Sequence, residues 1–247
     1  MTNNVIFTTM AGLQAISTQM NATASNLANL QTPGYQALQA ATEAAPYLGV
    51  EAPSGADAIS LVPTPNLTAG SATPTGNPLN IALGGNAWLA VQTPNGTALT
   101  RNGSLQISSA GILSDSAGNP ILGISGQPIS LPNLTKLEIG HDGTVSGVPS
   151  GQAGSLAQSY GQLNLVSTPS GGLTPLGGSL FAPAAGVSLQ ASQDGSVQQG
   201  YLNASTAEPT QSMMAMIEGS RSYQLQTELL KAQSGGGQQL NTLLAQG

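Results

Sequence analysis

Apolar residues in the first part of the chain recur in steps of three and four, with Thr23 filling one slot, and the positions between them hold Asn, Gln, Thr and Ser. This spacing predicts an amphipathic helix over residues 1–31, because side chains three and four apart share one helix face. Pro33 and Gly34 end the pattern, since Pro33 disfavours a helical Thr32 and Pro-Gly suits a type II turn. The apolar positions are Ile6, Met10, Leu13, Ile16, Met20, Leu27 and Leu30.

A second helical pattern occupies the end of the chain. From Met213 onward, apolar and small residues alternate in steps of three and four, and Glu208 just before them suits the start of a helix electrostatically. The alternation predicts a helix over residues 208–247. Because the chain begins and ends in long helices, we expect these helices to pair with each other or with identical helices of other subunits.

Between the helices the period changes to two. Residues 77–200 hold short runs of alternating polarity, and dipeptides typical of hairpin turns separate them at Asn95-Gly96, Asn102-Gly103, Asp142-Gly143 and Asp194-Gly195. Residues 32–76 are rich in Ala, Pro, Thr and Ser, and we interpret them as an extended connector. The predicted fold class is α+β, with long N- and C-terminal helices pairing in a coiled-coil-like bundle and a central antiparallel β domain.

Composition narrows the range of functions. Of 247 residues, 4 are basic and 10 are acidic, so charged residues make up 6% of the chain. Four basic residues cannot build a phosphate-binding stripe, which argues against nucleic acid as a partner. The absence of cysteine excludes disulfides and thiolate metal sites. Since no run of about 18 apolar residues occurs and the N-terminus lacks the basic and apolar regions of a secretory signal, we expect no membrane span and no cleaved signal peptide.

Candidate catalytic groups are few. The single histidine, His141, stands beside Asp142-Gly143, a turn pair that explains its surroundings without chemistry. The carboxylates of Glu138, Asp142 and Asp194 have no spacing that selects an acid–base pair, and neither a P-loop nor a dinucleotide-binding fingerprint occurs. We interpret Trp88 as a core residue and the methionines of the second helix as packing residues. We therefore expect no catalytic residue, no cofactor and no metal site.

Three motifs resemble the bacterial flagellar rod and hook proteins. Residues 24–29 with Thr32-Pro33-Gly34-Tyr35 are similar to the N-terminal signature of that family, and residues 216–223 are similar to its C-terminal helix. Residues 78–93 and 100–104 resemble the start of its β domain. Within the family, residues 85–92 and the chain length are most similar to the basal-body rod proteins of the proximal rod. The family-signature residues are Asn26, Leu27, Asn29, Thr32, Pro33, Gly34 and Tyr35.

The resemblance implies a structural protein and not an enzyme. Members of the family are exported unfolded by the flagellar type III apparatus, without a cleaved signal peptide, and stack helically in the periplasm as part of the drive shaft that transmits torque for motility. The expected partners are copies of the chain and the other proximal- and distal-rod proteins. The residues expected to contact neighbouring subunits are Ile6, Met10, Leu13, Ile16, Met20, Leu27, Leu30, Met213, Met216, Ile217, Tyr223 and Leu230.

Other interpretations and one departure from the family stand beside this one. The chain could be a distal-rod or hook-type axial protein of the same family. It could also be a secreted β-rich adhesive or carbohydrate-binding module, which would need an exposed aromatic surface. An enzyme is disfavoured by the lone turn histidine. The departure is the glycine run at residues 235–237, where family members keep helix formers and where we expect the last helical turns to fray or break.

Overall fold

The structure, a computed structural model, describes residues 2–45, 58–151, 156–168, 172–184, 186, 189–192 and 194–244. The chain folds into two compact units. Unit 1 comprises Met1–Ala28, Leu38–Thr64 and Glu208–Gly247, and unit 2 comprises Asn29–Ala37 and Pro65–Ala207. The helices and the first two strands therefore belong to unit 1, and the remaining strands to unit 2.

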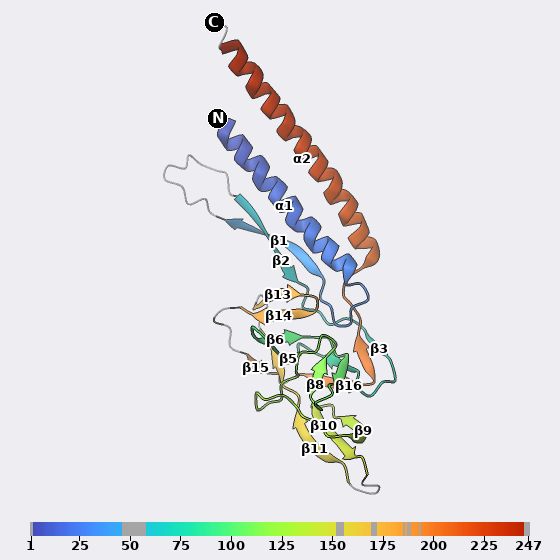
Figure 1. Cartoon of the computed structure of the whole chain (residues 1–247). Coiled ribbons are helices and arrows are strands. Elements are labelled where there is room, and N and C mark those ends of the chain that lie inside the picture. Colours follow the sequence, from blue (N-terminus) through green and yellow to red (C-terminus); the bar gives the residue numbers. More distant parts are fainter. Residues whose placement is uncertain are drawn as a thin grey trace. The chain divides into compact units, whose positions relative to one another are not determined.

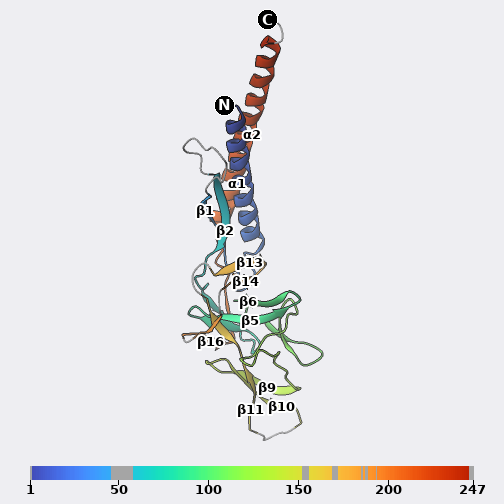
Figure 2. The ribbon, with the colours of Figure 1, turned by 90° about the vertical axis from the view of Figure 1, so that its left-hand side faces the viewer.

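Unit 1 consists of two long helices and one pair of strands, and the helices lie side by side in antiparallel directions (Figures 1 and 2). The helix α2 begins at a proline, whose missing N–H is not needed in the first turn, and the Ser212 N–H donates to the Glu208 carbonyl at 3.0 Å. It continues through the glycine run at residues 235–237, where we expected a break. The elements are α1 (Thr2–Ala28), β1 (Leu38–Ala45), β2 (Ala58–Pro65) and α2 (Pro209–Leu244).

Unit 2 is built from short strands that pair antiparallel. The largest sheet has six strands in the order β13-β14-β6-β5-β12-β15, and a second sheet has the order β11-β10-β9. Two-stranded pairs join β16 to β4, β17 to β3 and β7 to β8. The strands are β3 (Ala72–Pro74), β4 (Ile81–Gly84), β5 (Trp88–Thr93), β6 (Gly96–Thr100), β7 (Leu105–Ile107), β8 (Leu113–Asp115), β9 (Leu134–Ile139), β10 (Thr144–Pro149), β11 (Gln158–Gln162), β12 (Leu165–Ser167), β13 (Leu173–Gly177), β14 (Leu180–Pro183), β15 (Gln190–Ala191), β16 (Ser196–Gln199) and β17 (Tyr201–Asn203).

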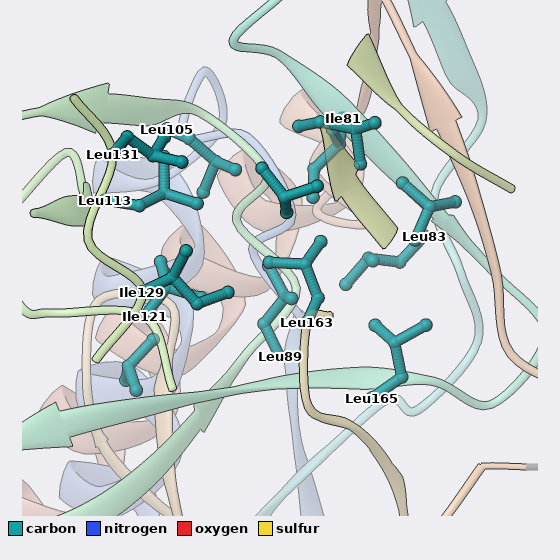
Figure 3. Close-up of a cluster of buried hydrophobic side chains, with 14 of the residues drawn as sticks. Ile81, Leu83, Leu89, Leu105, Leu113, Ile121, Ile129, Leu131, Leu163 and Leu165 are labelled. Carbon is teal, nitrogen blue, oxygen red and sulfur yellow. The ribbon is translucent and has the colours of Figure 1, made fainter. Parts of the chain in front are cut away.

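The core of unit 2 is formed by aliphatic side chains from many strands. Figure 3 shows this cluster, in which Leu89 and Leu163 lie among isoleucines and leucines from β4, β7 and β8 and from the segment between β8 and β9. Each such side chain contributes about 1.5–3 kcal/mol when it is fully buried. A second cluster holds Trp88, which is fully buried, together with Leu99 and Phe181. The prediction that Trp88 is a core residue is confirmed.

Two of the predicted turn dipeptides join hairpins. Asn95-Gly96 connects β5 to β6, with Gly96 at a φ of 121°, and Asp142-Gly143 connects β9 to β10, with Gly143 at a φ of 82°. Asn102-Gly103 does not, because it follows β6 in a segment that packs against β4. A Cβ on Gly103 would overlap the Ile81 carbonyl oxygen, so the glycine is needed for close packing and not for a hairpin.

The predicted fold class is wrong. We expected an α+β fold whose terminal helices pair in a coiled-coil-like bundle, but the described part of the chain holds more strand than helix, with two helices and no evident coiled-coil bundle. The physical reason is that the helices meet at glycines and not along a closed apolar seam. Met213, Ile217 and Tyr223, which such a seam would bury, remain exposed.

The predicted connector, residues 32–76, contains the strands β1, β2 and β3. Its middle, residues 46–57, lies outside the described residues. The division into residues 1–31, 32–76, 77–200 and 208–247 stays a prediction.

Candidate assembly surface

The two helices of unit 1 approach closely at two glycines. Gly219 of α2 faces Met20 of α1, and a Cβ built on Gly219 would lie 2.9 Å from the Met20 Cγ. Gly12 of α1 faces Gln226 of α2, where a built Cβ would lie 2.6 Å from the Gln226 Nε2. A glycine opposite a long side chain brings two helices close together. These two contacts define the face of each helix that is covered within the subunit.

On α1, most of the predicted contact residues lie partly covered. Met10 is the exception, since 56% of its surface is exposed. The side chain of Ile6 lies outside the described ones. Leu30 belongs to unit 2, where it packs against a small cluster that contains Tyr35. The half-buried residues are Leu13, Ile16, Met20 and Leu27.

On α2, the predicted contact residues separate into two groups. Met216 and Leu230 are half-buried. Met213, Ile217 and Tyr223 are exposed, with 54%, 56% and 44% of their surfaces accessible. The structure therefore does not bring the predicted set onto one face of this helix, and the role of these residues as subunit contacts stays a prediction.

A row of exposed side chains at intervals of four runs along α2. We call this row the α2 ridge, and its members are Met213, Ile217, Arg221, Leu225 and Leu229. Met214 flanks the ridge and is also exposed. Rows of residues four apart form ridges that pack into the grooves of a neighbouring helix, so this row has the form of a helix-docking surface. Arg221 stands in the middle of the row, and the other four side chains are apolar. Exposed apolar side chains gathered in this way are typical of interaction sites.

Sequence reasoning missed four residues of this surface, which are Met214, Arg221, Leu225 and Leu229. The spacing of four is visible in the sequence, but a search for one 3,4 alternation per helix finds only one face. The helix α2 has a second, apolar face beside the one directed at α1. The apolar residues spaced by four along residues 213–229 are the sequence signal for this second face.

In unit 2, the residues that follow α1 are bonded to the residues that precede α2. The Gly34 N–H donates to the Asn203 carbonyl at 2.8 Å, and the Thr206 N–H donates to the Tyr35 carbonyl at 3.0 Å. The Ala37 N–H donates to the Thr206 Oγ1 at 2.8 Å. Tyr35 is buried, with 1% of its surface exposed. We call these two segments, residues 29–37 and 203–207, the helix-end clamp.

Gly34 fits the clamp because only glycine can occupy its position. Its φ is 66°, in the left-handed region, and a Cβ would overlap the Arg101 carbonyl oxygen. Other family-signature residues hold the backbone near it, since the Thr32 hydroxyl donates to the Asn29 Oδ1 at 3.0 Å. Within unit 1, the Asn26 side-chain amide makes two hydrogen bonds of 2.8 Å with the Leu38 backbone at the start of β1.

Three family models of flagellar proteins match this chain. The model "Flagella basal body rod protein" matches residues 6–36, "Flagellar hook protein FlgE/F/G D1 domain" matches residues 82–147, and "Flagellar basal body rod FlgEFG protein C-terminal" matches residues 198–243. The flagellar basal-body rod protein FlgF of Escherichia coli (strain K12) is 31% identical over 250 residues, which cover 98% of this chain and 99% of the relative.

The chain belongs to the flagellar basal-body rod protein family. The FlgF of Salmonella typhimurium is 30% identical over 98% of this chain and 99% of the relative. A FlgG of Buchnera aphidicola is 29% identical over 94% of this chain and 96% of the relative. Family membership makes the protein a structural component of the flagellar rod and not an enzyme, and it implies assembly with other rod and axial proteins.

The matched regions of the rod family coincide with the geometry described above. The N-terminal match ends at residue 36, within the first segment of the helix-end clamp, and the C-terminal match begins at residue 198, just before the second segment. Each terminal match thus contains most of one helix of unit 1 and nearly all or all of one segment of the clamp in unit 2.

The central match contains a buried cation. The Arg101 guanidinium lies over the Trp88 ring, with its Cζ 4.8 Å from the ring centroid, and its Nη2 donates to the Gly85 carbonyl at 2.7 Å. Burial of this group lowers the pKa of Arg101 to about 10. Phe181 contacts the Trp88 ring edge-on at 5.3 Å. Because Trp88 is enclosed in this way, it offers no stacking surface for a carbohydrate, and the adhesive-module interpretation is not favoured.

The remaining candidate chemical groups have structural surroundings. The His141 Nδ1 lies 3.0 Å from the Val197 carbonyl oxygen. The Thr144 hydroxyl and N–H donate to the Asp142 carboxylate at 2.6 and 3.0 Å, and these bonds lower the pKa of Asp142. Within the described residues, no group of three or more His, Cys, Asp or Glu side chains could hold a metal ion. No helix among them has the length and apolar character needed to cross a membrane.

Proposed function

We propose that the chain is a subunit of the proximal rod. In this proposal the flagellar type III apparatus exports the chain, and copies of it stack helically in the periplasm with the other rod proteins. The stacked subunits transmit torque along the drive shaft. Three things support the proposal: membership of the rod family, the likeness to FlgF along nearly the whole chain, and the exposed apolar surface of unit 1.

The α2 ridge is the observation that carries the proposal. Four of its five members are apolar, and all four of these side chains are more than half exposed. Covering apolar surface stabilises association by roughly 25 cal/mol per Å². A neighbouring helix laid against this row would cover it, whereas the face of α2 that carries Gly219 is already directed at α1. We therefore propose the ridge, with Met214 and Met10, as the principal contact surface between subunits.

The proposal is tested by placing a charge on the ridge. Ile217→Asp puts a carboxylate where an assembled neighbour would remove water, and an unpaired buried carboxylate is strongly disfavoured. The matched control is Ile217→Leu, which keeps an apolar side chain of the same volume. Each variant replaces the chromosomal copy, and swimming, export into the periplasmic fraction and incorporation into purified basal bodies are measured.

We expect Ile217→Asp to be exported but absent from basal bodies, with non-motile cells, and Ile217→Leu to behave like the wild type. The melting temperature of unit 2 should not change in either variant, because residue 217 belongs to unit 1. Normal incorporation of Ile217→Asp would contradict the proposed contact surface. Retention of the wild-type chain in the cytoplasm, when the export apparatus is intact, would contradict the proposed route.

A further inference from the structure

All sulfur in this chain is confined to its terminal regions. The six methionines are at positions 1, 10, 20, 213, 214 and 216, and the chain has no cysteine. All six positions belong to unit 1, so unit 2 contains no sulfur. Thioether oxidation can therefore change unit 1 while it leaves the core of unit 2 chemically unaltered.

We propose that Met213 and Met214 form an oxidation site that controls subunit association. The inference rests on the proposed function, because it requires the α2 ridge to be a contact surface. The oxidant is a peroxide. One oxygen atom is transferred from the peroxide to the methionine sulfur, so that the thioether loses two electrons and becomes a sulfoxide, while hydrogen peroxide is reduced to water.

Exposure sets the order in which the thioethers react. Met214 is 66% exposed and Met213 is 54% exposed, so a small oxidant reaches both side chains directly. Met20 is half-buried beside Gly219, and Met216 is half-buried on the same helix as the exposed pair. Met10 of α1 is exposed, and it serves as a second reactive position outside α2.

Position on the helix determines what the sulfoxide does. Met213 and Met214 stand four and three residues before Ile217, so the three side chains are neighbours on the surface of α2. A sulfoxide oxygen is a hydrogen-bond acceptor, and an apolar neighbouring helix would cover it without a donor. Burying one unpaired polar group of this kind weakens association by about ten- to a hundredfold. Reduction by a methionine sulfoxide reductase restores the apolar side chain.

The first experiment measures reactivity on the full-length purified chain. Hydrogen peroxide is added in steps, and peptide mass spectrometry follows the gain of one oxygen atom at each methionine. We expect Met10, Met213 and Met214 to be oxidised at concentrations that leave Met20 and Met216 largely intact, with the unfolding temperature of unit 2 unchanged. Equal oxidation of Met213, Met214 and Met216 in the folded chain would overturn the assigned site.

The second experiment measures the consequence in cells. The double variant Met213→Gln/Met214→Gln carries polar side chains that imitate the sulfoxide, and the control Met213→Leu/Met214→Leu stays apolar and cannot be oxidised. We expect the Leu variant to be incorporated into basal bodies at the wild-type level. The Gln variant should be incorporated at about a tenth of that level or less, while both variants are exported equally.

The outcomes separate the inference from the proposed function. If the Gln variant is incorporated as well as the Leu variant while Ile217→Asp is excluded, the ridge is a contact surface but oxidation at residues 213 and 214 does not control it. If Ile217→Asp is also incorporated normally, the proposed contact surface itself is wrong. Reduced incorporation of the Leu variant would show that these positions require methionine itself, and it would also overturn the oxidation site.

Discussion

The two units of this protein differ in how they cover their apolar side chains. In unit 2, strands from distant parts of the sequence enclose Trp88, Leu89 and Leu99 completely. In unit 1, Ala22 is the one buried apolar residue among the described side chains, and the α2 ridge remains in contact with solvent. Isolated helices are marginal in water, because their stability comes mainly from packing. The difference indicates that unit 2 is stabilised by its own contacts, whereas the helices of unit 1 are less stable and keep apolar surface in contact with solvent.

The largest expected effect is a difference in amide hydrogen exchange between the two units. In the purified monomer, amides in the middle of β5 and β6 should exchange at least about a thousandfold more slowly than those near Leu13 and Met216, because the strands open only with global unfolding. Mass spectrometry of the two sets of peptides measures the ratio. Equal protection of strands and helices in a chain shown to be monomeric would remove the distinction between the units.

A second prediction breaks the helix-end clamp. Gly34→Ala introduces a Cβ that overlaps the Arg101 carbonyl and forces alanine into a left-handed backbone, so unit 2 should lose about 3 kcal/mol or more. For a unit of this size the loss corresponds to a fall of roughly 6–12 °C in melting temperature. The matched control is Gly76→Ala, where φ is 70° and nothing lies within 4 Å of the added Cβ.

The Gly76→Ala control should lower the stability of unit 2 by only about 1–2 kcal/mol, which is the cost of a left-handed conformation for alanine. Equal losses in the two variants would show that the contact between Gly34 and Arg101 contributes nothing. Thermal unfolding followed by tryptophan fluorescence reports on unit 2 directly, since Trp88 is the one tryptophan in the chain.

A third and smaller effect concerns the pairing of the helices in unit 1. Gly219→Leu places a large side chain where even a Cβ would lie 2.9 Å from the Met20 Cγ. Overpacking of this kind costs about 1–3 kcal/mol, which exceeds the helix propensity of about 1 kcal/mol gained by removing a glycine. We expect lower helicity by circular dichroism and faster exchange in α1. Ala232→Leu, at an exposed position of the same helix, should change neither quantity. Unchanged α1 exchange in Gly219→Leu would contradict the close helix contact.

The smallest expected effect is the pH dependence at the β9–β10 turn. The bonds from Thr144 lower the pKa of Asp142 in the folded chain, so the ionised carboxylate stabilises unit 2 above the ordinary aspartate pKa of about 4. That contribution is lost as the pH falls through the lowered folded pKa. The melting temperature of Asp142→Asn should therefore decline less steeply than that of the wild type below pH 4. If the melting temperatures of the two proteins decline in parallel, the Asp142 carboxylate does not contribute to the stability of unit 2.

Local signals in the sequence predicted the local structure well. The 3,4 spacing of apolar residues predicted helices at the two ends of the chain, and α1 and α2 occupy them. Asn95-Gly96 and Asp142-Gly143 predicted hairpins, and the glycine of each pair adopts a positive φ, which such turns require. Asn102-Gly103 carries the same signal, but its glycine is fixed by the Ile81 backbone, a contact between segments distant in the sequence that spacing does not reveal.

The candidate assembly surface was only partly predictable. Met213 and Ile217 were expected on it because they are apolar and helical. Leu225 and Leu229 were missed, since the sequence does not say which of two apolar rows on α2 faces α1. Met20 and Gly219 decide that question by their mutual approach, because a helix packs by the side on which its partner can come closest.

The sequence by itself determined the positions of the two helices, two of the hairpin turns and the resemblance to the rod family. These properties depend on residue type and on spacing over a few positions. Only the tertiary structure decided that the described residues hold more strand than helix, that the clamp joins residues 29–37 to residues 203–207, and that a second apolar row on α2 stays exposed. Each of these features depends on contacts between residues far apart in the chain. The free energy of such contacts comes from close packing and burial, which a local sequence pattern does not reveal.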